Sequence, residues 1–173
     1  MTVSDDDRVR RHEAGEMPLS GQPPSDAARP GATGGIVRRF RSGDHETRAA
    51  LLELCGQLAD RGLGEDDLGT VELILAEALN NITEHAYGPE GGPVEVHLQV
   101  TGSRIECELR DYGRPMPMGD LPAAGLPMID PPDLVPEGGF GWYIIRCLVE
   151  DLRYQRVGGH NRLTLSLTAG DSG

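Results

Sequence analysis

Alternating apolar and polar residues mark two hairpins in the second half of the chain. Residues 94–100 place Val or Leu at every second position, and residues 105–110 repeat the alternation after a Gly-Ser turn. A period of two puts all the apolar side chains of a strand on one face. The pattern therefore predicts an antiparallel hairpin with one buried face, and a second hairpin formed by residues 152–157 and 163–168.

Apolar residues that recur every three or four positions mark the helices. One helix begins near Ser42 or Asp44, and its predicted apolar stripe is Leu51, Leu52, Leu54, Cys55 and Leu58. A second helix spans about 66–86, and a third follows Gly141 and runs to about Glu150. Helical spacing of this kind gathers the apolar side chains on the side that faces the core.

The order of these elements predicts the fold class. A short strand at residues 36–40 precedes two helices, a hairpin, a proline-rich loop at 112–137, a helix and the last hairpin. Helices on one face of a mixed, mostly antiparallel sheet form an α+β two-layer sandwich. We expect this domain to span residues 35–169. Residues 1–34, charged and then rich in Pro, Gly, Ser and Ala, are expected to be a disordered tail.

Composition and charge disfavour several classes of function. The 173 residues carry a net charge of −12, which would repel the phosphates of nucleic acid and of anionic membranes. All 16 basic residues are arginine, so the lysine of the phosphate-binding loop and of eukaryotic-type protein kinases is missing. Three widely spaced cysteines and the lack of an apolar stretch of membrane-spanning length lead us to expect a cytoplasmic protein.

Two polar residues on the second helix form the first candidate site. Glu77 and Asn81 are four residues apart, so their side chains project together, away from the apolar stripe. Asn can supply a hard oxygen to Mg²⁺, while Glu can orient or deprotonate a nucleophile. The same spacing also fits an ordinary solvated helix face, so it does not decide the chemistry by itself.

Two glycine-containing motifs add to this pair. Asp111 and Gly113 lie where the first hairpin ends; the Asp can accept a hydrogen bond from an exocyclic amine such as that of adenine, and the Gly lets the backbone approach a flat base. Gly138, Gly139 and Gly141 open the third helix, where free N–H groups and the helix dipole suit phosphates. Taken singly, the motifs also fit a turn and a flexible loop.

Together, and in this order, three stretches resemble the nucleotide site of the GHKL ATPase superfamily, which has the Bergerat ATP-binding fold. They are AEALNNITEHAY, DYG and EGGFGWYII, at residues 76–87, 111–113 and 137–145. Within the superfamily they are most similar to the anti-sigma factor serine/threonine kinases. The resemblance implies ATP and Mg²⁺ as cofactors, with Glu77 as general base for an attacking serine and Asn81 as magnesium ligand.

The resemblance also assigns roles to the remaining motif residues. It implies that Asp111 recognises adenine and that Gly113 shapes the pocket of the base. Thr164 resembles the family threonine that supports the adenine-binding aspartate. The glycines that would line the phosphates are Gly138, Gly139 and Gly141. His85 and Tyr87 match the end of the family's helix, where packing is their simpler role.

Partners follow from the same resemblance. It implies a sigma factor, a STAS-domain antagonist whose serine is phosphorylated, and a second copy of the chain in a homodimer. Glu137 stands where some relatives carry a basic residue, and Arg114 is a candidate to supply that charge. The alternatives are a non-catalytic, nucleotide-gated protein-binding module and an interaction domain with a vestigial pocket.

Overall fold

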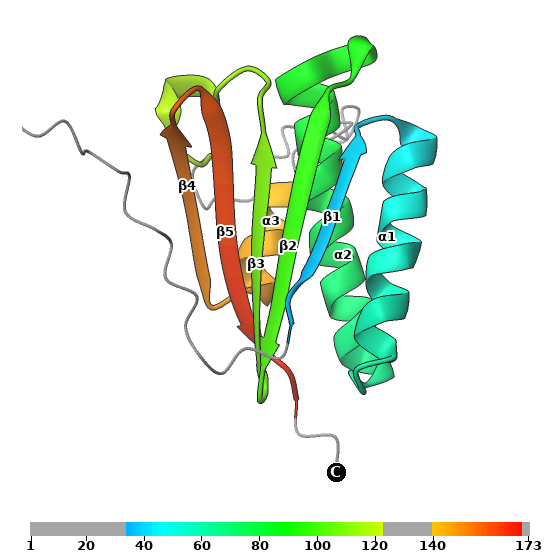
Figure 1. Ribbon diagram of the computed structural model, residues 1–173. Helices are drawn as coiled ribbons and strands as arrows, with labels where there is room; N and C mark the ends of the chain where they lie inside the picture. The colour runs from blue at the N-terminus through cyan, green and yellow to red at the C-terminus, as the bar shows by residue number, and fades with distance from the viewer. Residues whose placement is uncertain (1–33, 123–139, 171–173) are drawn as a thin grey trace, which may run out of the picture. The chain divides into compact units, whose positions relative to one another are not determined.

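One sheet with helices on a single face makes up the described part of the protein, residues 34–122 and 140–170 of the computed structural model (Figure 1). Its strands are β1 (Ile36–Arg41), β2 (Pro93–Thr101), β3 (Arg104–Asp111), β4 (Asp151–Val157) and β5 (His160–Thr168). They lie in the order β1-β2-β3-β5-β4, and all four pairings are antiparallel. The predicted α+β two-layer sandwich is confirmed, with antiparallel pairing throughout the described sheet.

Three helices form the second layer: α1 (Asp44–Ala59), α2 (Glu65–Asn81) and α3 (Gly141–Leu148). Acidic residues fill the first turn of α2, where they complement the positive end of the helix dipole. The helix then widens into a π-helical turn, η1 (Ile82–Tyr87), followed by the 3₁₀ turn η2 (Gly88–Glu90). Such π turns are rare and often occur at functional sites.

The core lies between the helices and the inner face of the sheet. Alternate strand residues point into it, as predicted, and they meet the apolar side of α2; the set includes Val94, Val96, Leu98, Ile105, Leu109, Leu163, Leu165, Ile74, Leu75 and Leu79. The predicted stripe of α1 is wrong at Leu52, which is 65% exposed. Leu54 and Leu58 are buried one turn apart, whereas Leu52 lies about 200° around the helix from Leu54.

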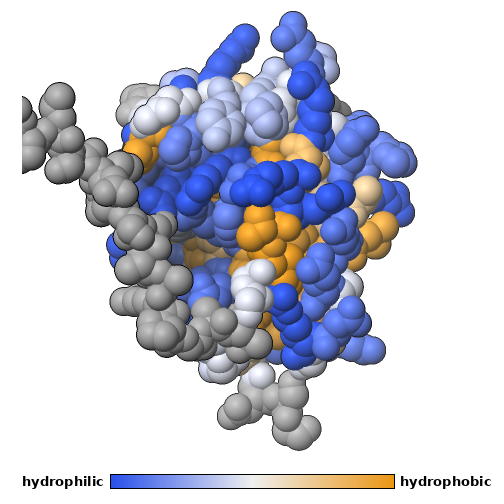
Figure 2. Space-filling view, in the orientation of Figure 1, coloured by the Kyte–Doolittle hydropathy of each residue, from blue (hydrophilic) through white to orange (hydrophobic). Residues whose placement is uncertain are grey.

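Paired charges cover the outer face of the sheet, on which no described helix packs. Arg39 on β1 donates to Glu95 on β2 at 2.6 Å, and Arg162 on β5 donates to Glu108 on β3 at 2.7 Å. Figure 2 shows this face as mostly hydrophilic. Cross-strand pairs of this kind contribute modestly to stability. None of the helices in the described residues has the length and apolar character needed to cross a bilayer.

Candidate functional site

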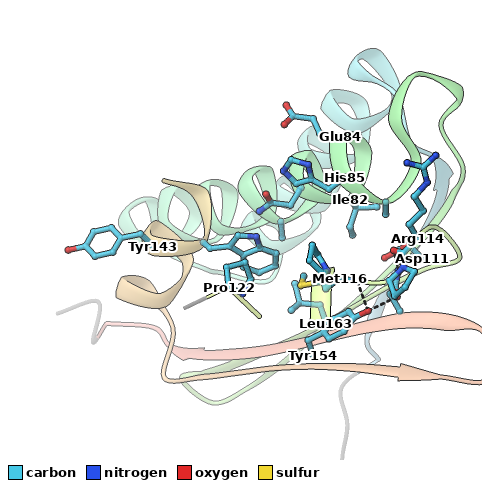
Figure 3. Close-up of a pocket in the computed structure, with 17 residues that line it drawn as sticks. Ile82, Glu84, His85, Asp111, Arg114, Met116, Pro122, Tyr143, Tyr154 and Leu163 are labelled. Atoms are coloured by element: carbon cyan, nitrogen blue, oxygen red, sulfur yellow. Dashed lines mark hydrogen bonds between the residues drawn. The ribbon is translucent and has the colours of Figure 1, made fainter. Parts of the chain in front are cut away.

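A cavity of about 780 Å³ opens between the end of α2, the end of β3 and the start of α3 (Figure 3). This volume falls within the roughly 300–1,000 Å³ typical of small-molecule sites. Its walls mix apolar, aromatic and polar side chains, and they include Asn81, Ile82, Glu84, His85, Asp111, Arg114, Met116, Pro122, Trp142, Tyr143, Tyr154, Asn161 and Leu163. Asp111 and Arg114 lie at one end in Figure 3, and Tyr143 lies at the other.

Asp111 provides a buried carboxylate at the first end. It is the last residue of β3, is 5% exposed, and lies on the inner face of the sheet with Leu109. Its Oδ1 accepts hydrogen bonds from the backbone N–H of Gly113 at 2.9 Å and from Nδ2 of Asn161 at 2.7 Å. Burial raises the pKa of Asp111, and the two hydrogen bonds only partly oppose that shift. Its Oδ2 makes no hydrogen bond within the described residues, so it is the oxygen available to a ligand.

Asn161 is the functional residue that sequence reasoning missed. It lies directly opposite Asp111 in the pairing of β3 with β5, whereas Thr164 lies opposite Glu108. Because side chains alternate along a strand, Thr164 points to the outer face of the sheet and does not reach Asp111. The contact with Asp111 that was expected of Thr164 is made by Asn161. The sequence did indicate that Asn161 faces inward, because counting back from the buried leucines of β5 in steps of two reaches Asn161.

Gly113 and Tyr87 hold the backbone of the Asp111 motif against the end of η1. A Cβ on Gly113 would lie 2.6 Å from the carbonyl oxygen of Ala86, so this close approach requires glycine. The Tyr87 hydroxyl accepts a hydrogen bond from the N–H of Tyr112 and donates one to a backbone carbonyl of β2, both at 2.7 Å. The packing role predicted for Tyr87 is confirmed, whereas His85 is exposed and lines the cavity.

Glu77, Asn81 and Gly141 come together where α2 meets the start of α3. A Cβ on Gly141 would lie 2.5 Å from Oε2 of Glu77 and 3.5 Å from Nδ2 of Asn81. Nδ2 of Asn81 is buried and has no hydrogen-bond partner among the described residues, whereas the neighbouring Asn80 is exposed. A buried N–H donor without a partner calls for an acceptor, such as a phosphate oxygen of a ligand, and only Oδ1 of the same carboxamide could bind a metal ion.

Metal binding here would have to combine this carboxamide with oxygens from a nucleotide. The described residues hold no group of three His, Cys, Asp or Glu side chains that could bind an ion. Mg²⁺ commonly keeps several waters and takes few protein ligands together with substrate phosphates, so Oδ1 of Asn81 could serve as its protein ligand.

Three further sequence assignments concern the surroundings of the phosphates. Gly138 and Gly139 lie outside the described residues. Arg114 lies at the Asp111 end of the cavity, where its N–H donates to the carbonyl of Ala86 at 2.9 Å and its own carbonyl accepts from Asn161. Its backbone is therefore tied to the end opposite Tyr143, which does not support the phosphate role considered for it.

The fold and the site fit a nucleotide-binding α+β domain, and comparison with known proteins identifies its family. Residues 41–167 match the histidine kinase-like ATPase domain family. The chain belongs to this family, and the predicted resemblance is thereby confirmed. The family implies that the domain binds ATP. The matched residues include α1, α2, α3 and the strands β2 to β5, and they begin at the last residue of β1.

Individual relatives are named as protein kinases. The serine/threonine-protein kinase BtrW of Bordetella bronchiseptica is 35% identical over 97 residues, which cover 56% of this chain and 68% of that protein. The serine-protein kinase RsbW of Bacillus cereus is 27% identical over 104 residues, which cover 59% of this chain and 65% of the relative. The chain thus spans about two thirds of the length of these relatives.

A solved structure shows the same fold. The crystal structure of the RsbU and RsbW domains of Rv1364c from Mycobacterium tuberculosis aligns with a TM-score of 0.56 at 17% sequence identity. The alignment covers 79% of this chain and 33% of that chain. At this identity the comparison supports the fold alone.

Proposed function

We propose that this protein is an ATP-dependent serine protein kinase and anti-sigma factor that phosphorylates a STAS-domain antagonist in a partner-switching pathway. The observation that carries the proposal is the grouping of Glu77, Asn81 and Gly141 beside a cavity whose other end presents the free oxygen of Asp111. Phosphoryl transfer from ATP to a hydroxyl requires a hydrogen-bond acceptor for the adenine and a carboxylate near the phosphates that can take the proton of the hydroxyl.

Each end of the cavity has its own task in this mechanism. Asp111 would accept a hydrogen bond from the exocyclic amine of adenine, and Gly113 would let the backbone lie close to the base. Asn81 would hold Mg²⁺, which when bound would neutralise charge on the phosphates. The start of α3 at Gly141, together with Gly138 and Gly139, would surround the phosphates with backbone N–H groups.

Glu77 would act as the general base for the attacking serine. Its Oε2 lies against the first turn of α3, so a phosphate held there would be within reach of the same carboxylate. The carboxylate takes the proton of the incoming serine hydroxyl as the oxygen attacks the terminal phosphorus and the bond to the leaving diphosphate breaks.

The partners and the setting belong to the proposal as well. The relatives' names, serine- and serine/threonine-protein kinase, support a protein substrate. We place a sigma factor and a STAS-domain antagonist as partners in the cytoplasm, a homodimer as the assembly, and residues 35–169 as the kinase domain. The net charge of −12 speaks against nucleic acid and anionic membranes as partners.

The test is transfer of label from ATP·Mg²⁺ to a serine of a cognate STAS-domain protein. Glu77→Gln keeps the shape of the side chain and removes the base, so we expect transfer to fall by roughly 10²- to 10⁴-fold while ADP affinity is unchanged. The matched control is Glu72→Gln, an exposed position on the same helix, which should transfer at the wild-type rate. Undiminished transfer by Glu77→Gln would refute the assigned base.

The second candidate is a nucleotide-gated binding module without catalysis. One observation favours it: Asn81 lines the cavity, whereas Glu77 is not among the lining residues. Tight ATP binding by the wild-type protein, with a regulator bound but no label on any cognate STAS-domain protein, would support this module over the kinase.

A further inference from the structure

We propose that the exposed side of α2 around Leu73 is the docking surface for the serine-bearing segment of the substrate protein, and that it selects a segment with an apolar residue about two or three positions from the serine. This inference rests on the proposed kinase function, whose substrate it narrows. Leu73 lies before the first of the three sequence motifs, which begins at residue 76.

The order of residues along α2 places Leu73 on one side of Glu77 and the cavity on the other. The residues of α2 and η1 that line the cavity run from Ala78 to Ala86. Leu73 is one helical turn before Glu77, so their Cβ atoms are about 5–6 Å apart. Glu77 therefore stands at the boundary between the cavity and the surface around Leu73.

The position of the nucleotide sets the direction from which a serine can approach Glu77. In phosphoryl transfer the attacking and leaving oxygens lie roughly in line. Gly141, which packs against Oε2 of Glu77, marks the proposed place of the terminal phosphate, and the leaving diphosphate extends from there into the cavity. The serine must then come from outside the cavity, past Glu77. The segment that carries it crosses α2 near Leu73.

Leu73 offers this segment an apolar contact. Its side chain is 43% exposed and lies outside the core that the described residues form. An exposed leucine needs no explanation by itself. Its neighbours on the helix surface, however, are the small residues Gly69 and Ala76, and a Cβ on Gly69 would meet no atom within 4 Å. The sides of Leu73 are therefore open, so an apolar side chain of a partner could pack against it.

The charge of this helix restricts the partner further. α2 and η1 contain six acidic residues and no arginine; the acidic residues are Glu65, Asp66, Asp67, Glu72, Glu77 and Glu84. Asp66 is two turns before Leu73 on the same side of the helix, and it is exposed. The phosphates of ATP would add more negative charge. A partner surface with arginine or lysine is therefore attracted here, and an acidic surface is repelled.

The spacing along α2 sets the position of the apolar residue in the substrate. A serine oxygen that gives its proton to the Glu77 carboxylate lies about 3 Å from it, and Leu73 is one turn away. An extended chain advances about 3.3–3.6 Å per residue, so about two or three residues cover this distance. An apolar residue closer to the serine or much farther from it could not reach Leu73.

The experiment measures transfer of label from ATP·Mg²⁺ by the full chain, at increasing concentrations of a STAS-domain protein that the wild type phosphorylates. Leu73→Glu should raise the KM for that protein by about tenfold, because an apolar contact is lost and a charge takes its place. The kcat and the affinity for ADP should stay as in the wild type, which is the signature of a lost docking contact. Leu73→Met keeps an apolar side chain and should keep the wild-type KM.

The matched control is Val37→Glu on β1. Val37 is 47% exposed and pairs with His97 on the outer face of the sheet, so the same change there should leave the KM unchanged. Leu73→Glu should fold, because the side chain is exposed and glutamate is a good helix former. Added salt should raise the wild-type KM, since screening weakens the attraction between opposite charges.

Changes in the substrate test the spacing. Mass spectrometry identifies the labelled serine, and the apolar residue about two or three positions from it is replaced by alanine. This replacement should raise the KM of the wild type and have little further effect on Leu73→Glu, since both changes remove the same contact. Lysine at that position should lower the KM of Leu73→Glu. Fully additive effects would overturn the pairing.

The outcomes separate the inference from the function on which it rests. A wild type that labels no cognate STAS-domain protein would overturn both. Normal transfer with equal KM values for Leu73→Glu and Val37→Glu would overturn the docking surface and leave the kinase standing. A lower kcat or weaker ADP binding at unchanged KM would assign Leu73 to the nucleotide instead. Loss of self-association in Leu73→Glu at unchanged KM would show that the surface binds a second copy, which also overturns the inference.

Discussion

The two ends of the cavity are built in different ways. At the Asp111 end, the polar side chains are buried and bonded to one another, and Asp111 and Asn161 are only 5% and 4% exposed. At the Glu77 end, two side chains of α2 meet the first turn of α3, and Nδ2 of Asn81 has no hydrogen-bond partner among the described residues. One end has its contacts in place before a ligand arrives, and the other has contacts still to make.

This difference separates binding from transfer. Sheet register fixes the Asp111 end, and a preorganised acceptor selects a ligand at little cost in conformational entropy. The Glu77 end depends on how α2 and α3 approach each other and on the group that binds Nδ2 of Asn81, which is unpaired within residues 34–122 and 140–170. We therefore expect changes at the first end to alter affinity and base preference, and changes at the second to alter the dependence on magnesium and the transfer rate.

The first prediction has the largest expected effect on binding, and it tests the two ends of the cavity directly. Asp111→Asn replaces the charged acceptor, so ADP affinity should fall by roughly 10- to 100-fold with or without magnesium. Asn81→Ala should weaken ADP only when magnesium is present. Titration calorimetry with Mg²⁺ and with EDTA measures both. If Asn81→Ala weakened ADP equally in EDTA, the assignment of this end to the metal would be wrong.

A smaller effect, on stability, compares the two glycines. The Cβ of Gly113→Ala would meet backbone atoms of Ala86 at 2.6 and 2.7 Å, which cannot move freely, and we expect a loss of about 1–3 kcal/mol. The Cβ of Gly141→Ala would meet the end of the flexible Glu77 side chain at 2.5 Å. That variant should keep its stability and lose transfer. Urea unfolding measures the stability of both variants. Equal destabilisation of the two would contradict the expected difference.

The smallest effect concerns pH. Burial raises the pKa of Asp111, and protonation removes the acceptor that adenine needs, so ADP affinity should decline as the pH falls through this raised pKa. The decline should begin at a higher pH than it would for an exposed aspartate. Asp111→Asn should abolish it. A pH response that survives in that variant would have to come from another group.

Local patterns in the sequence predicted much of this protein. The period of two identified β2, β3 and β5, and the period of three to four identified α1 and α2, because each pattern records which side of its own element is buried. The residues 77, 81, 111 and 113 were recognisable for a similar reason. Each pair sits on one element or one turn, so its members are close together in sequence and in space.

Tertiary structure decided which distant residues meet. Asn161, and not Thr164, faces Asp111 because the register of β3 and β5 sets the pairing, and a shift by an odd number of residues turns a side chain to the other face. The docking of α3 likewise brought Gly141 against Glu77, and the path of the chain after β3 placed Arg114 beside Asp111 and away from Tyr143. Partners across strands and between helices depend on geometry that no single segment contains, so the sequence alone could name the groups of the site but not all of their neighbours.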